Sequence, residues 1–173
     1  EKVVEALARF NSFICNSREA QKYYRELLEL NPKSKQWNAF LQSLNYTYDA
    51  TQEEYLNYCL KYSSLNTSNN DYIEHKNNKK INIGFVSPNF KTHSVSFFLK
   101  DVIEKINKNN FKIHAFSNLE RAHHDEVTEF FKENFDRWND IYEMSDQELT
   151  KLVRSYNIDI LIDLAGFTKD HRI

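Results

Sequence analysis

Residues 81–88 read INIGFVSP, and this stretch decides the fold class of the chain. Its apolar residues, ended by a Ser-Pro pair, predict a buried strand. A helical pattern follows over 94–106, and a second apolar run lies at 111–116. A strand, a helix and a further strand in this order are typical of a parallel sheet with helical crossovers. The helix is expected to present one apolar face, formed by Val95, Phe98, Leu99, Val102, Ile103 and Ile106.

The alternation of helix and strand signals continues to the end of the sequence. Helical spacing is present at 125–135, and a short strand is predicted at 140–142. Ser145 and Glu148 have the spacing of a capping box and predict the start of another helix. An apolar run at 158–164 predicts a last strand that is covered on both faces. We therefore expect an α/β fold with a Rossmann-like parallel sheet.

The N-terminal part has helical rather than strand periodicity. Apolar residues recur at helical spacing over 2–14 and over 18–30, and Pro32 ends the second pattern. The spacing of Ala20, Tyr24 and Leu27 before this proline matches the second helix of a tetratricopeptide repeat. A plain helical hairpin explains the same spacing equally well, so both interpretations stay open.

The chain is predicted to contain two structured parts joined by a polar linker. Two more helices are expected, at 35–44 and from a capping box at Thr51 to about Tyr62. The following stretch is rich in Ser, Asn and Lys, which is typical of a linker. The expected division is a TPR-like helical segment at 1–62, a linker at 63–80 and an incomplete Rossmann-like lobe at 81–173. The first residue is not methionine, so a piece of a longer protein is expected.

Composition argues against several classes of partner. The formal net charge of -2 gives no basic surface for nucleic acid, and no apolar run has the length of a membrane span. Cys15 and Cys59 lack the spacing of a zinc site, as do the adjacent His123 and His124. These features favour reduced thiols and a cytoplasmic protein. We expect no nucleic-acid partner, no membrane partner and no metal.

The rare glycines and prolines point to a ligand site. Open parallel sheets bind ligands beyond the carboxyl ends of their strands, and here those ends are 87–90 and 165–168. Gly84, Pro88 and Gly166 lie in or beside these two segments, and the chain has only 2 glycines and 2 prolines. No glycine-rich dinucleotide or phosphate-loop motif is present. His93 follows the first of these segments, where it is a candidate general base, with helix capping or packing as the alternative role.

Two motifs and their order resemble a known enzyme family. Residues 83–95, IGFVSPNFKTHSV, resemble the opening of the catalytic region of the O-GlcNAc transferase family. Residues 163–172, DLAGFTKDHR, resemble the family pattern DLxGxTxxxR, and 125–128 and 136–141 between them fit bacterial members. The resemblance implies a glycosyltransferase that moves N-acetylglucosamine from UDP-GlcNAc to protein Ser/Thr hydroxyls with inversion. Such proteins have two Rossmann-like lobes of the GT-B type and helical repeats that recruit protein substrates, and they need no metal or other cofactor.

The resemblance also implies roles for individual residues. By position, His93 matches the histidine proposed to assist catalysis near the acceptor, while Asn89, Gly166, Thr168 and Lys169 match substrate-binding positions of the cleft. The second lobe, which supplies most of the UDP-binding groups in the family, is not in this chain. We therefore expect the chain alone to be inactive and to bind UDP-GlcNAc only weakly.

Two departures from the family pattern support a different class of function. Asn89 stands where the family usually has aspartate, and Phe167 stands where histidine or tyrosine is usual. The first change removes a carboxylate beside His93, and the two changes are expected either to weaken catalysis or to mark a subfamily. Asn89 and the missing lobe favour the alternative of a non-catalytic protein-interaction scaffold or pseudoenzyme derived from the family, whereas the retention of His93, Gly166 and Thr168 argues against it.

Overall fold

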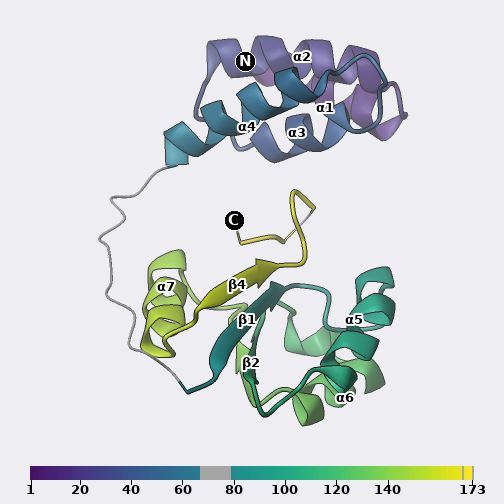
Figure 1. Cartoon of the computed structure of the whole chain (residues 1–173). Coiled ribbons are helices and arrows are strands. Elements are labelled where there is room, and N and C mark those ends of the chain that lie inside the picture. Colours follow the sequence, from purple (N-terminus) through teal and green to yellow (C-terminus); the bar gives the residue numbers. More distant parts are fainter. Residues whose placement is uncertain (67–78, 169, 173) are drawn as a thin grey trace. The chain divides into compact units, whose positions relative to one another are not determined.

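The computed structural model describes residues 1–66, 79–168 and 170–172, and the chain divides into two compact units, Glu1–Tyr72 and Ile73–Ile173 (Figure 1). The helix α4 (Gln52–Asn66) continues past the boundary predicted at Tyr62, so the first residues of the predicted linker are helical. Most of that predicted linker, residues 67–78, lies outside the described residues.

The first unit consists of helices. The predicted hairpin is present as α1 (Lys2–Phe13) and α2 (Ser17–Leu30), and it is followed by α3 (Trp37–Leu44) and α4. Helices α1, α2 and α3 bury apolar side chains that recur at helical spacing, and α4 contributes half-buried residues such as Tyr58 and Tyr62. The buried core contains Ala8, Ala20, Tyr24, Leu27, Leu28, Trp37, Phe40, Leu41 and Leu44.

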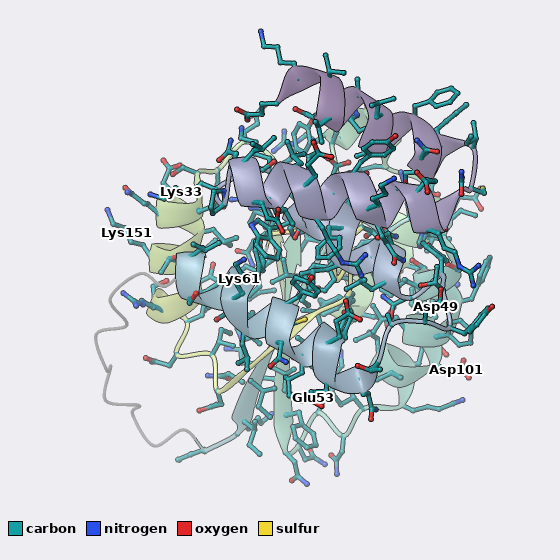
Figure 2. All side chains as sticks on the ribbon, turned by 90° about the horizontal axis from the view of Figure 1, so that it is seen from above. Lys33, Asp49, Glu53, Lys61, Asp101 and Lys151 are labelled. Atoms are coloured by element: carbon teal, nitrogen blue, oxygen red, sulfur yellow. The ribbon has the colours of Figure 1, made fainter. Side chains whose placement is uncertain are left out.

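Aromatic and polar contacts fix the packing of this unit. The rings of Phe40 and Tyr58 meet edge to face at 4.7 Å, an arrangement that aromatic pairs favour. Trp37 donates through Nε1 to the carbonyl of Pro32 at 2.7 Å, which ties α3 to the end of α2. Figure 2 shows charged side chains such as Lys33 and Glu53, which are exposed. The described helices include none with the length and apolar composition needed to cross a membrane.

The second unit is built on a parallel sheet, as the sequence predicts. Its strands are β1 (Ile81–Ser87), β2 (Phe111–Ser117), β3 (Arg137–Asp140) and β4 (Ile160–Asp163), in the spatial order β3-β2-β1-β4. All three strand pairs are parallel, so their carboxyl ends meet at one edge of the sheet. The predicted α/β fold class is confirmed.

Helices cover both faces of this sheet (Figure 1). Helices α5 (Ser94–Lys105) and α6 (Glu126–Asn134) pack on one face, and α7 (Asp146–Ser155) packs on the other. The strands alternate their side chains between the two layers, which is why two separate cores form. The first core contains Ile83, Phe85, Phe90, Leu99, Ile103, Ile113, Ala115, Phe131 and Phe135. The second contains Val86, Phe116, Ile141, Leu149 and Ile158.

Three predictions about these elements were wrong in detail. Strand β3 spans Arg137–Asp140 rather than 140–142. Its bounds are set by pairing with β2, which runs from His114 opposite Arg137 to Ser117 opposite Asp140. On α5, Phe98 and Val102 are 79% and 52% exposed, so the sheet covers a narrower face than predicted. In β4, Ile160 and Leu161 are 46% and 51% exposed because this strand lies at one end of the described sheet rather than between two neighbours.

Gly84 shows why glycine stands inside a central strand. A Cβ atom at this position would lie 2.9 Å from both Leu161 Cδ1 and Phe116 Cε2, and 3.3 Å from Ile158 Cγ2. The two 2.9 Å distances are shorter than real Cβ atoms show, and the 3.3 Å distance is tight. The side chains of Leu161, Phe116 and Ile158 therefore approach β1 this closely because the residue is glycine.

Candidate functional site

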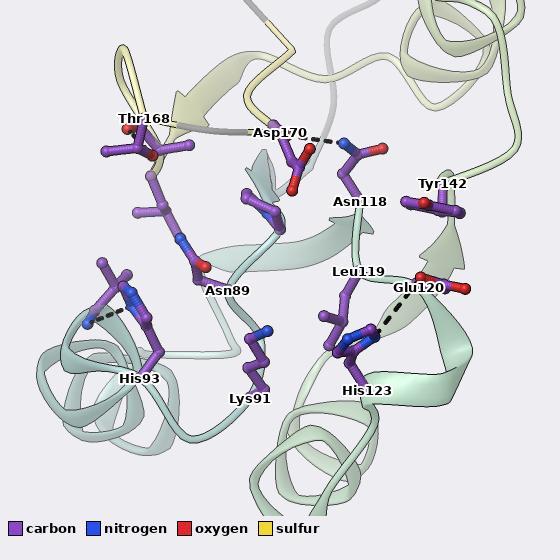
Figure 3. A pocket seen from close by; sticks show the side chains of 14 residues that line it. Asn89, Lys91, His93, Asn118, Leu119, Glu120, His123, Tyr142, Thr168 and Asp170 are labelled. Atoms are coloured by element: carbon purple, nitrogen blue, oxygen red, sulfur yellow. Dashed lines mark hydrogen bonds and ion pairs between the residues drawn. The ribbon is translucent and has the colours of Figure 1, made fainter. Parts of the chain in front are cut away.

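A polar pocket lies at the carboxyl ends of β1, β2 and β4, where parallel sheets bind ligands (Figure 3). Its volume is about 470 Å³, which lies in the range of small-molecule sites. His93 and Thr168 lie on one side in Figure 3, and Glu120, His123 and Tyr142 lie on the other. The lining residues come from the segments after β1, β2, β3 and β4.

His93 lines this pocket and also begins helix α5. Its Nδ1 atom accepts a hydrogen bond of 3.3 Å from the backbone N–H of Val95, so the histidine is the N-cap of the helix. In a neutral imidazole, the nitrogen that accepts this bond carries no proton, and the proton therefore lies on Nε2. The ring nitrogen left for a ligand is thus a hydrogen-bond donor. This geometry favours orientation of a ligand oxygen over removal of its proton.

The loop that carries His93 is held at both ends. Ser87 Oγ accepts from the N–H of Asn89 at 3.0 Å, and the carbonyl of Asn89 accepts from Ser96 Oγ at 2.7 Å. Asn89 itself lines the pocket, as its predicted substrate-binding role requires. The backbone of the loop is therefore fixed to both β1 and α5.

Asp125 holds the same loop from the side of α6. Its carboxylate accepts from the backbone N–H of Thr92 at 2.8 Å and from that of Thr128 at 3.0 Å. Burial alone would raise the pKa of Asp125, but these hydrogen bonds outweigh it and hold the pKa well below its ordinary value. The residue stays ionised and links the start of α6 to the segment just before His93.

Of the site residues predicted after β4, namely Gly166, Thr168 and Lys169, the structure places Thr168 at the pocket. Thr168 lines it, and its hydroxyl donates to the carbonyl of Ala165 at 2.8 Å. Gly166 is not among the lining residues. It makes the turn, with a φ of 56° in the left-handed region that favours glycine, and its N–H donates to the Asp163 carboxylate. Lys169 lies outside the described residues.

Several lining residues were not predicted from the sequence. Asn118 and Glu120 follow β2, and Tyr142 follows β3, while Asp170 lies in the segment after β4. The rule that ligands bind beyond strand ends also applies to β2, so Asn118 could have been found by that signal. Glu120 and His123 form an ion pair of 3.7 Å when the histidine is protonated. The described residues contain no group of three or more His, Cys, Asp or Glu side chains arranged to hold a metal ion.

The fold and the pocket define a class of protein in which a helical unit is followed by a Rossmann-like parallel α/β unit. A polar pocket lies at the carboxyl ends of the strands of the second unit. No family model matches the sequence. Over 95 residues, the chain is 34% identical to the probable UDP-N-acetylglucosamine--peptide N-acetylglucosaminyltransferase SPINDLY of Oryza sativa subsp. japonica. It is 29% identical over 130 residues to the SPINDLY protein of Hordeum vulgare, and 28% identical over 94 residues to the corresponding enzyme SEC of Arabidopsis thaliana.

A solved structure extends this similarity to both parts of the sequence. A mutant O-GlcNAc transferase of Thermobaculum terrenum matches 90% of the chain with a TM-score of 0.77 and 25% identity. The chain is therefore distantly similar to the O-GlcNAc transferases in sequence and similar to one of them in structure, and the predicted resemblance to this family is confirmed.

The match covers only a small part of the relatives. The similar segment is 53% of this chain but 10% of the Oryza protein, and 73% of this chain but 13% of the Hordeum protein. The structural match covers 31% of the Thermobaculum chain.

Proposed function

We propose that the chain forms the acceptor side of a glycosyltransferase that moves N-acetylglucosamine from UDP-GlcNAc to Ser/Thr hydroxyls of proteins, with inversion. The observation that carries this proposal is the polar pocket at the carboxyl ends of the strands, lined by His93, Asn89 and Thr168. These residues stand at the motif positions that resemble the family, and the pocket gathers them from two distant segments.

In this proposal, His93 orients the acceptor hydroxyl rather than deprotonating it. Its Nδ1 is engaged by the N–H of Val95, so Nε2–H is the group that meets the acceptor oxygen. Base action would require the ring to release Val95 and give up the cap of α5. Because His93 keeps this cap and does not act as the base, another group of the assembled active site takes the proton of the acceptor hydroxyl. Recruitment of protein acceptors by the helical unit belongs to the same proposal.

The nucleotide-sugar would be held mainly by a second lobe. A calorimetric titration of the 173-residue chain with UDP and with UDP-GlcNAc is expected to give no micromolar binding. Micromolar binding to the chain alone would contradict the proposed division of the site. Transfer assays on the full-length gene product test the activity itself.

The amide of Asn89 favours a second candidate function, that of a non-catalytic scaffold or pseudoenzyme. It places a neutral group at a pocket position where the related enzymes usually have a carboxylate. Replacing Asn89 with aspartate in the full-length product discriminates the two proposals. A large gain in transfer from an inactive starting protein would support the pseudoenzyme, whereas an active starting protein would exclude it.

A further inference from the structure

The segment after β4 forms one wall of the pocket although it has no regular secondary structure. Leu164, Ala165, Thr168 and Asp170 all line the pocket. The N–H of Leu164 donates to the carbonyl of Val86 at 3.0 Å and attaches the start of this segment to β1. The hydrogen bonds from Thr168 to the carbonyl of Ala165 close a turn within the segment but do not attach its later residues to the strands. Irregular segments of this kind open easily unless side chains tie them down. The wall therefore depends on groups outside its own turn.

Asn118 provides the first attachment, from the end of β2. Its backbone N–H donates to the carbonyl of Ser87 at 2.8 Å, and its Nδ2 donates to the carbonyl of Asp170 at 2.8 Å. Asp170 has a φ of 63°, in the left-handed region that aspartate and asparagine tolerate better than most residues. The side chain of Asn118 thus bonds to the wall at the residue where the backbone turns into this conformation.

Arg172 fixes the side chain of Asn118 in turn. Its Nη1 donates to Asn118 Oδ1 at 3.3 Å. Its Nη2 donates to the carbonyl of Met144 at 2.9 Å and forms an ion pair with Asp146 Oδ1, also at 2.9 Å. The Arg172 side chain is 13% exposed, whereas the Asp146 side chain is 88% exposed, so the guanidinium is largely buried while its ion pair lies at the surface. One guanidinium therefore joins the wall to β2 and to the start of α7.

We infer that Arg172 and Asn118 act as a positioning pair that sets the affinity of the pocket for the acceptor. This inference rests on the proposed function. Arg172 is not among the residues that line the pocket, so it acts through Asn118 and Asp170. If the pair is broken, the wall with Thr168 moves away from His93, and the acceptor is bound less tightly.

The geometry requires arginine rather than any cation. A guanidinium presents several N–H groups in a rigid fork, so it can serve the Asn118 amide, the Met144 carbonyl and the Asp146 carboxylate at once. Lysine retains the charge opposite Asp146 but offers a single point of contact. Arg172→Lys is therefore expected to be intermediate between the unaltered protein and Arg172→Ala.

The first arm of the test is hydrogen exchange on the 173-residue chain. Arg172→Ala is expected to speed exchange at the amides of Gly166 and Thr168 by about tenfold, with Arg172→Lys in between. Arg154→Ala is the matched control, because Arg154 is an exposed arginine of the same α7 region and no hydrogen bond to Asn118 involves it. Equal exchange in Arg172→Ala and Arg154→Ala would overturn the inference.

The second arm is kinetics of the full-length gene product with an acceptor peptide. Arg172→Ala is expected to raise the KM for the peptide by about tenfold while the KM for UDP-GlcNAc and kcat stay within about twofold, and lysine is expected to restore part of the loss. A fall in kcat alone, with both KM values unchanged, would show a merely structural residue and overturn the inference. If the unaltered protein transfers no sugar, the proposed function fails, and the exchange arm still decides whether the pair holds the wall.

Discussion

The backbone N–H of Val95 donates a hydrogen bond of 3.3 Å to Nδ1 of His93, so one side chain both caps helix α5 and faces the pocket. The two roles use different ring nitrogens. Capping needs only an acceptor at the position of Nδ1, whereas contact with an acceptor substrate needs Nε2. Substitutions can therefore separate the structural role from the functional role.

The capping role is tested by comparing asparagine with alanine at this position. His93→Ala removes the acceptor for Val95 and is expected to lower the free energy of unfolding by about 1 kcal/mol. His93→Asn retains a side-chain oxygen suited to an N-cap and is expected to stay within about 0.5 kcal/mol of the unaltered chain. Urea unfolding of the three chains measures the difference. Equal losses in both variants would mean that the cap is not what His93 contributes to stability.

Asp125 is expected to position His93 through the Thr92 backbone. Asp125→Ala removes the N-cap of α6 and the acceptor of the Thr92 N–H, at a cost of about 1 kcal/mol or somewhat more. It should also change the imidazole NMR signals of His93. The matched control is Ser145→Ala, which removes the N-cap of α7. That variant is expected to lose similar stability and leave the His93 signals in place. Unchanged His93 signals in both variants would contradict the link.

The two glycines are required for different reasons, and their substitutions should behave differently. Gly84→Ala places a Cβ atom 2.9 Å from Leu161 and Phe116 and is expected to cost about 1–3 kcal/mol through overpacking. Gly166→Ala meets no atom within 4 Å but has a φ of 56°, so it is expected to cost about 1–2 kcal/mol through backbone strain. Gly166→Asn should cost less, because asparagine tolerates this conformation, whereas Gly84→Asn should be worse than alanine. Urea unfolding of the four variants tests both explanations.

His114 should make the stability of the α/β unit depend on pH. The residue is 1% exposed on β2, its ring lies 5.3 Å from that of Tyr156, and neither ring nitrogen has a hydrogen-bond partner among the described residues. Burial, aided by the charges of Lys112 and Arg137, lowers the pKa of His114 to about 4. Between pH 6.5 and pH 4, this histidine is therefore protonated in the unfolded chain, where its pKa is near 6.5, but neutral in the folded chain.

It follows that His114 destabilises the folded chain progressively as pH falls from 6.5 toward 4. The expected loss between pH 7 and pH 4 is on the order of 3 kcal/mol. Other groups titrate in this range, so the comparison is with His114→Phe, which retains an aromatic ring beside Tyr156. The free energy of unfolding should fall less steeply with decreasing pH in that variant. Parallel pH profiles for the two chains would contradict a neutral, buried His114.

The sequence predicted the elements whose signals are local. β1 is an apolar run ended by Ser87-Pro88, and α7 has a capping box that the structure reproduces between Ser145 and Glu148. Strand β3 was misplaced because Arg137, Trp138, Asn139 and Asp140 form no apolar run. That segment is a strand because its backbone pairs with β2, which depends on tertiary structure rather than on its own side chains.

The sequence predicted residues of the candidate site that follow β1 and β4, but not the contacts that join distant segments. Asn89, His93 and Thr168 follow strands with strong signals, so the strand-end rule places them at the pocket. The strand-end rule also applies to Asn118 after β2, but nothing local in the sequence indicates that Asn118 and Arg172 contact each other. Their contacts require β1 and β2 to be paired in register, so that Ser87 lies beside Ser117, and require the segment after β4 to return toward β2. Such relationships follow from the assembled sheet.

The most direct measurement of the central claim is transfer of labelled N-acetylglucosamine from UDP-GlcNAc by the full-length gene product and its His93→Asn variant. The proposed function predicts transfer to Ser/Thr hydroxyls by the unaltered protein. It also predicts a kcat lower by about a hundredfold in the variant because the acceptor hydroxyl is no longer oriented, with an unfolding free energy within about 0.5 kcal/mol because the cap is retained. No transfer by the unaltered protein, or an unchanged kcat in His93→Asn, would contradict the claim that this pocket is the acceptor side of a glycosyltransferase.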